Sequence, residues 1–240
     1  MVNPLDYPTI RLPDHPTMNL GFIFDLDGTI VDSTAHYRAT WAELLAEFGA
    51  DDDPEMYLRR STRDNFRVLL GGEITDDELE QHVARQARIG NAKMRTHGVA
   101  MHDGIPELLH ALKARGVSLA VATSAERSNA EWTLDTLRIR DLFDVVVTDQ
   151  DVENGKPAPD VYREAVRRLG VNASHCAAME DSGTGVRAAK SAGMRVIGVV
   201  TTHARIELEQ AGADKIVARA RDLTVQDIID FMISSPQKGD

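Results

Sequence analysis

The sequence predicts an α/β fold, in which a Rossmann-like parallel sheet forms a core domain and a small α-helical cap domain is inserted into it. Two observations support this prediction. Short apolar runs rich in β-branched residues alternate with amphipathic helical patterns over the second half of the chain, which is typical of parallel sheets. A long interval after the first apolar run contains helical patterns and no convincing strand.

The expected strands are short, and most are separated by a helix that ends on glycine. The helical patterns Pro106–Arg115, Asp160–Leu169 and Thr184–Ala192 each precede a glycine, where a helix C-terminus favours a left-handed residue. This alternation predicts parallel strands joined by helical crossovers. The expected strands are 20–24, 117–122, 144–148, 175–179, 194–200 and, more weakly, 215–217.

The interval between the first two runs predicts a helical insertion. Ser33 is a candidate N-cap for a first helix that ends at Gly49, and a second helix is expected to end at Gly71-Gly72. A third begins at Thr75, with Glu78 at the capping-box spacing, and ends near Gly98. The predicted organisation is an extended N-terminal arm at 1–18, a core domain at 19–32 and 99–233, and a cap domain at 33–98.

Composition limits the partners. The 240 residues carry 27 Lys and Arg against 38 Asp and Glu, a net charge of −11, so nucleic acid and anionic membrane surfaces are not expected partners. No apolar stretch approaches the roughly 18 residues of a membrane span, and the first twenty residues do not resemble a secretory signal, which predicts a cytoplasmic protein. The single cysteine, Cys176, excludes an intrachain disulfide. A monomer and a homodimer are both compatible with the sequence.

Two aspartates follow the first expected strand. Because residues i and i+2 of a strand project to the same face, Asp25 and Asp27 are expected to converge at the carboxyl end of that strand. Open parallel sheets bind their ligands at this edge. The alternative interpretation is that both residues only cap a turn at Gly28.

Polar side chains also follow the other expected strands. Thr123 and Ser124 offer hydroxyl groups and backbone amides, Lys156 lies in a loop stiffened by two prolines, and Glu180 and Asp181 are a second acidic pair. Each has a simpler interpretation, as a turn cap, a solvated charge or a helix N-cap. Their coincidence at one edge of one sheet favours a shared site.

Four carboxylates at one edge require a cation, because each close pair would repel by about 4 kcal/mol at an effective dielectric near 20. Oxygen ligands without thiolates or clustered histidines favour Mg²⁺. Together with a lysine and a hydroxyl, Mg²⁺ can hold a phosphoryl group. One aspartate can then attack phosphorus, and the acid two residues later can protonate the leaving oxygen.

These segments resemble the haloacid dehalogenase-like superfamily, in the branch with a helical cap after the first strand. The segment DLDGTIVDS from Asp25 to Ser33 is similar to its first motif and Thr123 to its second. Gly155-Lys156-Pro157 is similar to the third motif, and Glu180-Asp181-Ser182 to the fourth. The motifs occur in the family's order and span nearly the whole chain.

The resemblance implies a role for each position. Asp25 is expected to be the nucleophile, Asp27 the acid/base, and Thr123, with Ser124 beside it, and Lys156 the phosphate-binding residues. Mg²⁺ is expected to be held by Asp25, the Asp27 carbonyl and Asp181, with Glu180 assisting. True dehalogenation is excluded, since family members with that chemistry lack the second aspartate and the metal.

The cap is expected to select the substrate. Arg63 falls where sugar-phosphate mutases of this branch carry an arginine that holds the distal phosphate, and Arg59 is a candidate to assist. The alternative is a solvated basic patch. Many relatives carry a histidine where this chain has Tyr37, with His36 just before it; His36 is a candidate substrate contact or an ordinary surface or hinge residue.

The leading hypothesis is a Mg²⁺-dependent phosphomonoesterase acting through an aspartyl-phosphate on a small phosphorylated metabolite, most plausibly a sugar phosphate. A β-phosphoglucomutase-like enzyme with the same site is the close alternative. A phosphorylation-dependent receiver is a remote one, because receivers are about half this length, carry adjacent acids and lack the helical insertion. A catalytically silent regulatory protein on this fold is a further alternative, opposed by the fact that every chemical position is filled.

Overall fold

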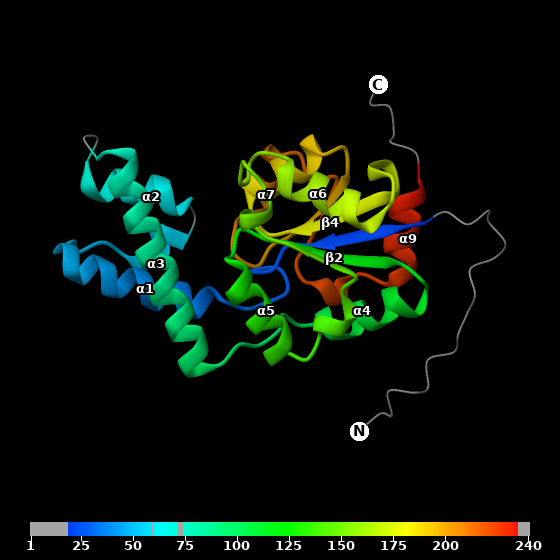
Figure 1. Ribbon diagram of the computed structural model, residues 1–240, viewed down its shortest axis with the longest axis horizontal. Coiled ribbons are helices and arrows are strands. Elements are labelled where there is room, and N and C mark those ends of the chain that lie inside the picture. The colour runs from blue at the N-terminus through cyan, green and yellow to red at the C-terminus, as the bar shows by residue number, and fades with distance from the viewer. Residues whose placement is uncertain (1–18, 59, 72–73, 235–240) are drawn as a thin grey trace. The chain divides into compact units, whose positions relative to one another are not determined.

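The computed structural model describes residues 19–58, 60–71 and 74–234. Two compact units make up the chain: one is the continuous stretch Val31–Ala100, and the other comprises the residues before and after it. Figure 1 shows the path of the chain through both. The expected arm at 1–18 lies outside the described residues.

The larger unit contains a six-stranded parallel sheet in the order β3-β2-β1-β4-β5-β6, which confirms the predicted fold class. The first strand in sequence lies inside the sheet, between β2 and β4. Each strand falls at an expected apolar run. The strands are β1 Gly21–Phe24, β2 Ser118–Ala122, β3 Val145–Val147, β4 Cys176–Glu180, β5 Arg195–Val199 and β6 Lys215–Val217.

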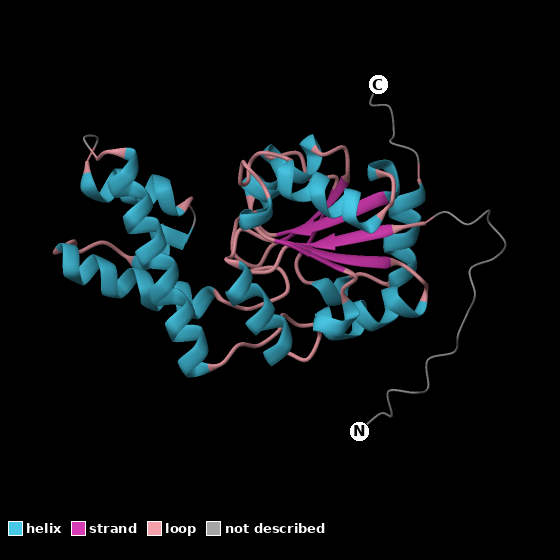
Figure 2. Ribbon diagram, in the orientation of Figure 1, coloured by secondary structure: helices cyan, strands magenta, loops and turns pink. Residues whose placement is uncertain are grey.

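The register of the sheet brings the carboxyl ends of the strands to one edge. Phe24, the last residue of β1, is paired with Val121 of β2 and with Met179 of β4. Because all strands run in the same direction, the loops that follow them gather at that edge (Figure 2). Residues far apart in the sequence therefore become neighbours there.

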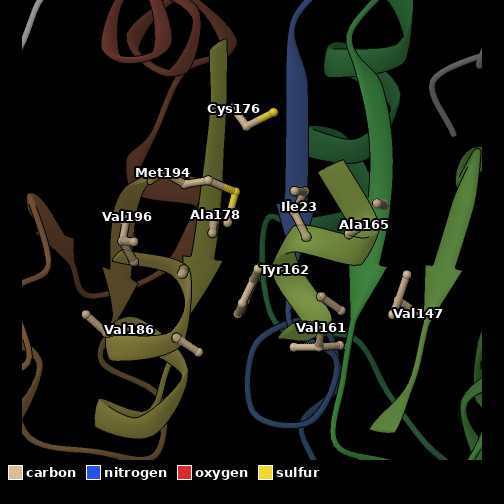
Figure 3. Packing of buried hydrophobic residues seen from close by; sticks show 14 of the residues in the cluster. Ile23, Val147, Val161, Tyr162, Ala165, Cys176, Ala178, Val186, Met194 and Val196 are labelled. Atoms are coloured by element: carbon tan, nitrogen blue, oxygen red, sulfur yellow. The ribbon is translucent and has the colours of Figure 1, made fainter. Parts of the chain in front are cut away.

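Helices cover both faces of the sheet. On one face α6 packs against β1, β2 and β3, and α7 packs against β4 and β5. Figure 3 shows their buried side chains, Val161, Tyr162 and Val186 among them, meeting those of the strands. On the other face α4 contacts β2, and α9 contacts β4. The α-helices of this unit are α4 Ile105–Ala114, α5 Arg127–Thr136, α6 Asp160–Leu169, α7 Gly183–Ser191, α8 Arg205–Gln210 and α9 Val225–Ile233, with 3₁₀ turns at Arg140–Leu142, Asp149–Asp151, Ala173–His175 and Ala220–Asp222.

The unit Val31–Ala100 is helical in its described residues, as the insertion pattern predicted. It has its own apolar core, in which the ring centroid of Trp41 lies 4.9 Å from that of Tyr57 and 5.1 Å from that of Phe66. Its elements are α1 Thr34–Phe48, a 3₁₀ turn Pro54–Leu58, α2 Thr62–Leu70 and α3 Asp76–His97.

The expected ends of the three helices in this unit and the expected start of the third agree with the structure, α2 ending before Gly71 and α3 before Gly98, but one expected cap is wrong. Thr75 and Glu78 form the predicted capping box at the start of α3, and Gly49 ends α1 in the left-handed conformation. Ser33 precedes α1, but its side chain makes no cap hydrogen bond. Its backbone is already in the helical region (φ −91°, ψ −3°), whereas a capping residue needs an extended backbone to aim its oxygen at the first N–H groups.

Among the helices of the described residues, none has the length and apolar character that crossing a membrane requires.

Candidate active site

The loop after β1 places Asp25 at the buried edge of the sheet. The Asp25 N–H donates to the Met179 carbonyl at 3.1 Å, so the β1–β4 ladder extends one residue beyond the strand. Asp25 is buried, and Asp27, two residues later in the same turn, is partly exposed. Gly28 has φ +84°, and a Cβ there would lie 2.2 Å from Asp181 Oδ2. Only glycine therefore fits between this turn and Asp181.

Lys156 joins Asp25 to Glu180. Its Nζ donates to Asp25 Oδ1 at 2.6 Å, to Glu180 Oε1 at 2.6 Å and to the Ala122 carbonyl at 3.0 Å, so all three ammonium hydrogens are used. Burial alone would lower the pKa of Lys156, but the charges of Asp25 and Glu180 outweigh burial and raise that pKa above its ordinary value. Lys156 is therefore a fixed cation.

Glu180 accepts hydrogen bonds at both carboxylate oxygens. Oε1 accepts from Lys156 and, at 2.6 Å, from the Tyr162 hydroxyl. Oε2 accepts from the backbone N–H of Ser182 at 3.3 Å and from its hydroxyl at 3.0 Å. A Cβ on Gly185 would lie 1.8 Å from Oε1, so the start of α7 leaves no space for movement of this side chain. Glu180 is a fully hydrogen-bonded partner of Lys156.

Tyr162 was missed by the sequence reasoning. It is fully buried on α6, and the Lys156 Nζ lies 5.0 Å from the centroid of its ring. Burial, and next the charge of Glu180, raise the pKa of Tyr162 well above its ordinary value. The hydroxyl therefore stays protonated and donates a hydrogen bond to Glu180. The available signal was a polar-tipped aromatic residue in the apolar stripe of the helix that follows the Lys156 loop.

Asp181 is held by two threonines. Thr29 Oγ1 donates to Oδ1 at 3.1 Å, and Thr202 Oγ1 donates to Oδ2. Burial is the main cause that raises the pKa of Asp181 to about 7; the charge of Glu180 adds to it, and the two threonine hydrogen bonds oppose it. Thr202 was also missed, although it follows β5 at the same edge where Thr123 follows β2.

The carboxylates of Asp25, Glu180 and Asp181 lie close enough to share a cation, since one oxygen of each falls within 4.8 Å of the others. Burial is the main cause that raises the pKa of Asp25 well above its ordinary value; Lys156 opposes this, and the other two acids add to it. One lysine does not balance three carboxylates. The donor set, all oxygen, and its excess negative charge therefore fit a hard divalent cation.

Thr123 and Ser124 lie at the same edge of the sheet. The Thr123 N–H donates to the Val147 carbonyl at 3.0 Å, and its Oγ1 accepts from the Ala125 N–H at 3.0 Å. Thr123 therefore caps its own turn, and its hydroxyl hydrogen is not used in that bond. Ser124 is exposed beside it. Both interpretations of Thr123, turn cap and ligand donor, are compatible with this geometry.

A third missed residue, Asp151, lies in the 3₁₀ turn after β3. It accepts from the Thr148 N–H at 2.8 Å, from Arg168 at 2.9 Å and from Arg127. Burial alone would raise the pKa of Asp151, but these hydrogen bonds outweigh burial and lower it. The carboxylate therefore stays charged and links α5, α6 and the end of β3.

Two of the cap candidates, Arg63 and His36, fall among the described residues of the unit Val31–Ala100. Arg63 is exposed and paired with Glu80. His36 lies in the first turn of α1, partly exposed, with its ring centroid 6.2 Å from that of His97. Arg59 lies outside the described residues. Asp25, Lys156, Glu180 and Asp181 are thus the predicted site residues that the structure brings into contact.

A buried lysine among carboxylates, at the carboxyl edge of a parallel sheet, defines an α/β enzyme site. The family description "Haloacid dehalogenase-like hydrolase" matches residues 22–199, which include each of these four side chains. The chain belongs to the haloacid dehalogenase-like hydrolases.

Three relatives show the range of activities near this chain. The validoxylamine A 7′-phosphate phosphatase of Streptomyces hygroscopicus subsp. limoneus is 35% identical over 196 residues, which cover 79% of this chain and 89% of the relative. The fructose-1-phosphate phosphatase YqaB of Escherichia coli (strain K12) is 31% identical over 182 residues, covering 75% and 95%. The β-phosphoglucomutase of Bacillus subtilis (strain 168) is 29% identical over 213 residues, covering 85% and 91%.

The fold is also shared with a solved structure. A family IA, variant 3 hydrolase of the same superfamily from Entamoeba histolytica HM-1:IMSS superimposes with a TM-score of 0.78. The match covers 89% of this chain and 99% of that one at 24% identity, and it supports the fold.

Proposed function

We propose that this hydrolase is a Mg²⁺-dependent phosphatase of small phosphate monoesters, acting through an aspartyl-phosphate on Asp25. The observation that carries the proposal is the contact of Lys156 with both Asp25 and Glu180 beside Asp181. The buried Lys156 cation opposes the rise that burial causes in the pKa of Asp25, and it attracts an anionic phosphoryl group. Such a site lowers the barrier to phosphoryl transfer mainly by positioning and by neutralising charge.

The metal would be held by Asp25, the Asp27 carbonyl and Asp181, with Glu180 contributing charge. Bound there, Mg²⁺ would supply positive charge to the phosphoryl oxygens. Glu180 contributes at a distance, because its oxygens already accept from Lys156, Tyr162 and Ser182.

The proposed reaction has two steps, and each uses both aspartates. A carboxylate oxygen of Asp25 attacks phosphorus, the ester P–O bond breaks, and Asp27 gives its proton to the leaving oxygen. A water molecule then attacks the aspartyl-phosphate, Asp27 takes a proton from that water, and the new P–O bond replaces the bond to Asp25. Phosphate leaves and both side chains return to their starting states. Thr123 and Ser124 would hold the phosphoryl oxygens, and Lys156 would attract them as a fixed positive charge.

We propose a phosphorylated sugar or a sugar-like metabolite as the substrate. Support comes from the relatives, whose names specify fructose 1-phosphate and validoxylamine A 7′-phosphate. Arg63, Arg59 and His36 are the proposed contacts to the rest of the substrate.

A β-phosphoglucomutase-like activity is the second candidate, favoured by the relative from Bacillus subtilis. A mutase would use the same aspartyl-phosphate and return the phosphoryl group to a sugar in place of water. Conversion of β-glucose 1-phosphate to glucose 6-phosphate, with a bisphosphate primer, distinguishes it from a phosphatase.

The experiment is release of inorganic phosphate from a panel of sugar phosphates and other monoesters, with and without Mg²⁺, with Asp25→Asn as the blank. We expect metal-dependent release on one group of substrates and a loss of about a thousandfold or more in Asp25→Asn, since an amide is a poor nucleophile. The variant should stay folded, because the amide oxygen of Asn can still accept from Lys156, which keeps Glu180 as its charged partner. Release by Asp25→Asn at the wild-type rate would contradict the mechanism.

A further inference from the structure

Three consecutive residues after β5 contact both sides of the acidic cluster. Thr201 Oγ1 donates to the Gly28 carbonyl in the turn after β1. Thr202 Oγ1 donates to Asp181 Oδ2 at the end of β4. The His203 Nδ1 lies 2.9 Å from the same Thr202 oxygen. This segment, Thr201–His203, therefore links two strand ends that supply the proposed metal ligands.

The direction of each hydrogen bond follows from the chemistry of the groups. A carboxylate oxygen only accepts, so the single hydroxyl hydrogen of Thr202 points to Asp181. The Thr202 oxygen must then accept from His203, which places a hydrogen on Nδ1. His203, Thr202 and Asp181 form a chain of hydrogen bonds in one direction, in which each bond strengthens the next.

These contacts fix the side chain of Asp181 from two directions. Thr29 donates to one of its oxygens and Thr202 to the other. The Gly28 backbone lies close to Oδ2 as well, since any Cβ there would overlap that oxygen. Asp181 is 4% exposed and held in one orientation by these neighbours.

We propose that Thr202, supported by His203, is a positioning residue for the metal site: it holds Asp181 in the orientation that a divalent cation requires, while Thr201 holds the Gly28 turn beside it. The inference rests on the proposed function and adds residues to its site. Thr202 acts through Asp181. Hydrogen-bonding partners of metal ligands typically change metal affinity by 10–100-fold when they are removed.

The test is direct Mg²⁺ titration by calorimetry, without substrate, on variants that separate the hydroxyl from the shape of the side chain. Thr202→Val keeps the shape and removes the hydroxyl, so we expect Mg²⁺ binding to weaken by about 10–100-fold. Thr202→Ser keeps the hydroxyl, so we expect it to recover most of that loss. The rise in melting temperature caused by Mg²⁺ should follow the same order.

His203 gives a second, independent pair of variants. In His203→Asn the amide nitrogen can replace the Nδ1 donor, whereas His203→Leu has no donor. We expect Mg²⁺ affinity to fall by several-fold in His203→Leu and to be closer to wild type in His203→Asn. Should Thr202→Val fail to fold, this pair carries the test.

Kinetics separate a positioning role from a general structural one. In Thr202→Val the lost phosphatase activity should return at high Mg²⁺, because the defect lies in the affinity for the metal. Wild-type Mg²⁺ affinity in Thr202→Val, or equal losses in the valine and serine variants, would overturn the inference while leaving the proposed function in place. Absence of Mg²⁺ binding and of Mg²⁺-dependent turnover in the wild type would instead overturn the proposed function, and the inference with it.

Discussion

The buried ion-pair cluster of the unit with the sheet contrasts with an exposed ion pair in the unit Val31–Ala100. In the unit with the sheet, the side chain of Lys156 is 6% exposed, and its partners Asp25 and Glu180 are 10% and 0% exposed. In the unit Val31–Ala100, Arg63 and Glu80 form an ion pair in which both side chains are about half exposed. The first group depends on its partners for every hydrogen bond, and the second has water available.

This difference in exposure determines how well each group of charged residues tolerates substitution. Removing one member of a buried pair leaves a charge without water or a partner, which destabilises a protein strongly. Removing one member of an exposed pair has little effect, because water replaces the partner. The site of the sheet unit is therefore fixed as a set, whereas the charged surface of the helical unit can vary residue by residue.

The largest expected effect is that of Lys156→Met on stability. It leaves Asp25 and Glu180 buried without their cation. We therefore expect the free energy of unfolding, measured in denaturant, to fall by about 3–5 kcal/mol relative to wild type. Lys93→Met is the matched control: Lys93 pairs with Glu43 on the surface of the helical unit, and we expect a loss below about 1 kcal/mol. Equal losses in the two variants would remove the distinction between the two units.

A smaller effect is expected from Tyr162→Phe, which deletes a single hydroxyl. Glu180 then loses one donor, and hydrogen bonds to charged groups contribute about 1.5–3 kcal/mol. Tyr57→Phe is the matched control in the helical unit, where the Tyr57 hydroxyl donates to Asp52 at 2.7 Å in a partly exposed setting; its loss should be smaller. Denaturant unfolding of both variants compares them, and a neutral Tyr162→Phe would show that Lys156 and Ser182 satisfy Glu180 by themselves.

The pH dependence of Mg²⁺ binding probes the buried acids. The pKa of Asp181 is raised from 3.8 to about 7 in the folded protein. Between these values the metal-free folded state holds a proton that the unfolded state has lost, so its stability falls as pH rises toward 7. Mg²⁺ competes with that proton, and its affinity should rise about tenfold from pH 6 to pH 8.

Calorimetric titration at pH 6, 7 and 8 measures this dependence. The raised pKa of Asp25 acts in the same direction. An exposed metal site, with ordinary carboxyl groups, would show almost no change over this range. A flat profile would therefore contradict the raised pKa that burial and the charge of Glu180 give to Asp181.

The smallest expected effect on stability is that of Arg63→Met, below about 0.5 kcal/mol, because the Arg63–Glu80 pair is exposed. On the proposed role of Arg63, the same variant should raise KM for sugar phosphates while changing KM little for a small aryl phosphate. Equal changes in KM for both substrates would argue against a contact between Arg63 and the sugar.

Much of the fold could be predicted because a parallel sheet is regular. Apolar runs located the strands, and the rule that parallel carboxyl ends meet at one edge predicted that Asp25, Lys156 and Asp181 lie together. Tyr162 could not be found in this way, since it occupies an apolar stripe between Val161 and Ala165 and its hydroxyl partner is distant in sequence.

Two further residues show the limits of local patterns. Thr202 carries the same signal as Thr123, a hydroxyl shortly after a strand, but its partner Asp181 depends on the order of the strands, which apolar runs do not fix. Ser33 occupies a typical capping position, yet the backbone conformation at that residue prevents its side chain from capping.

The central place of β1 has a consequence for how the chain is made. On the ribosome β1 emerges before its two neighbours in the sheet, which begin only at Ser118 and Cys176. At 5–20 residues per second, β1 waits roughly ten seconds or more for its second neighbour. The continuous helical stretch Val31–Ala100 is fully synthesised during that wait. The apolar strand Gly21–Phe24, fully buried in the finished protein, thus stays without its full set of sheet neighbours through much of synthesis.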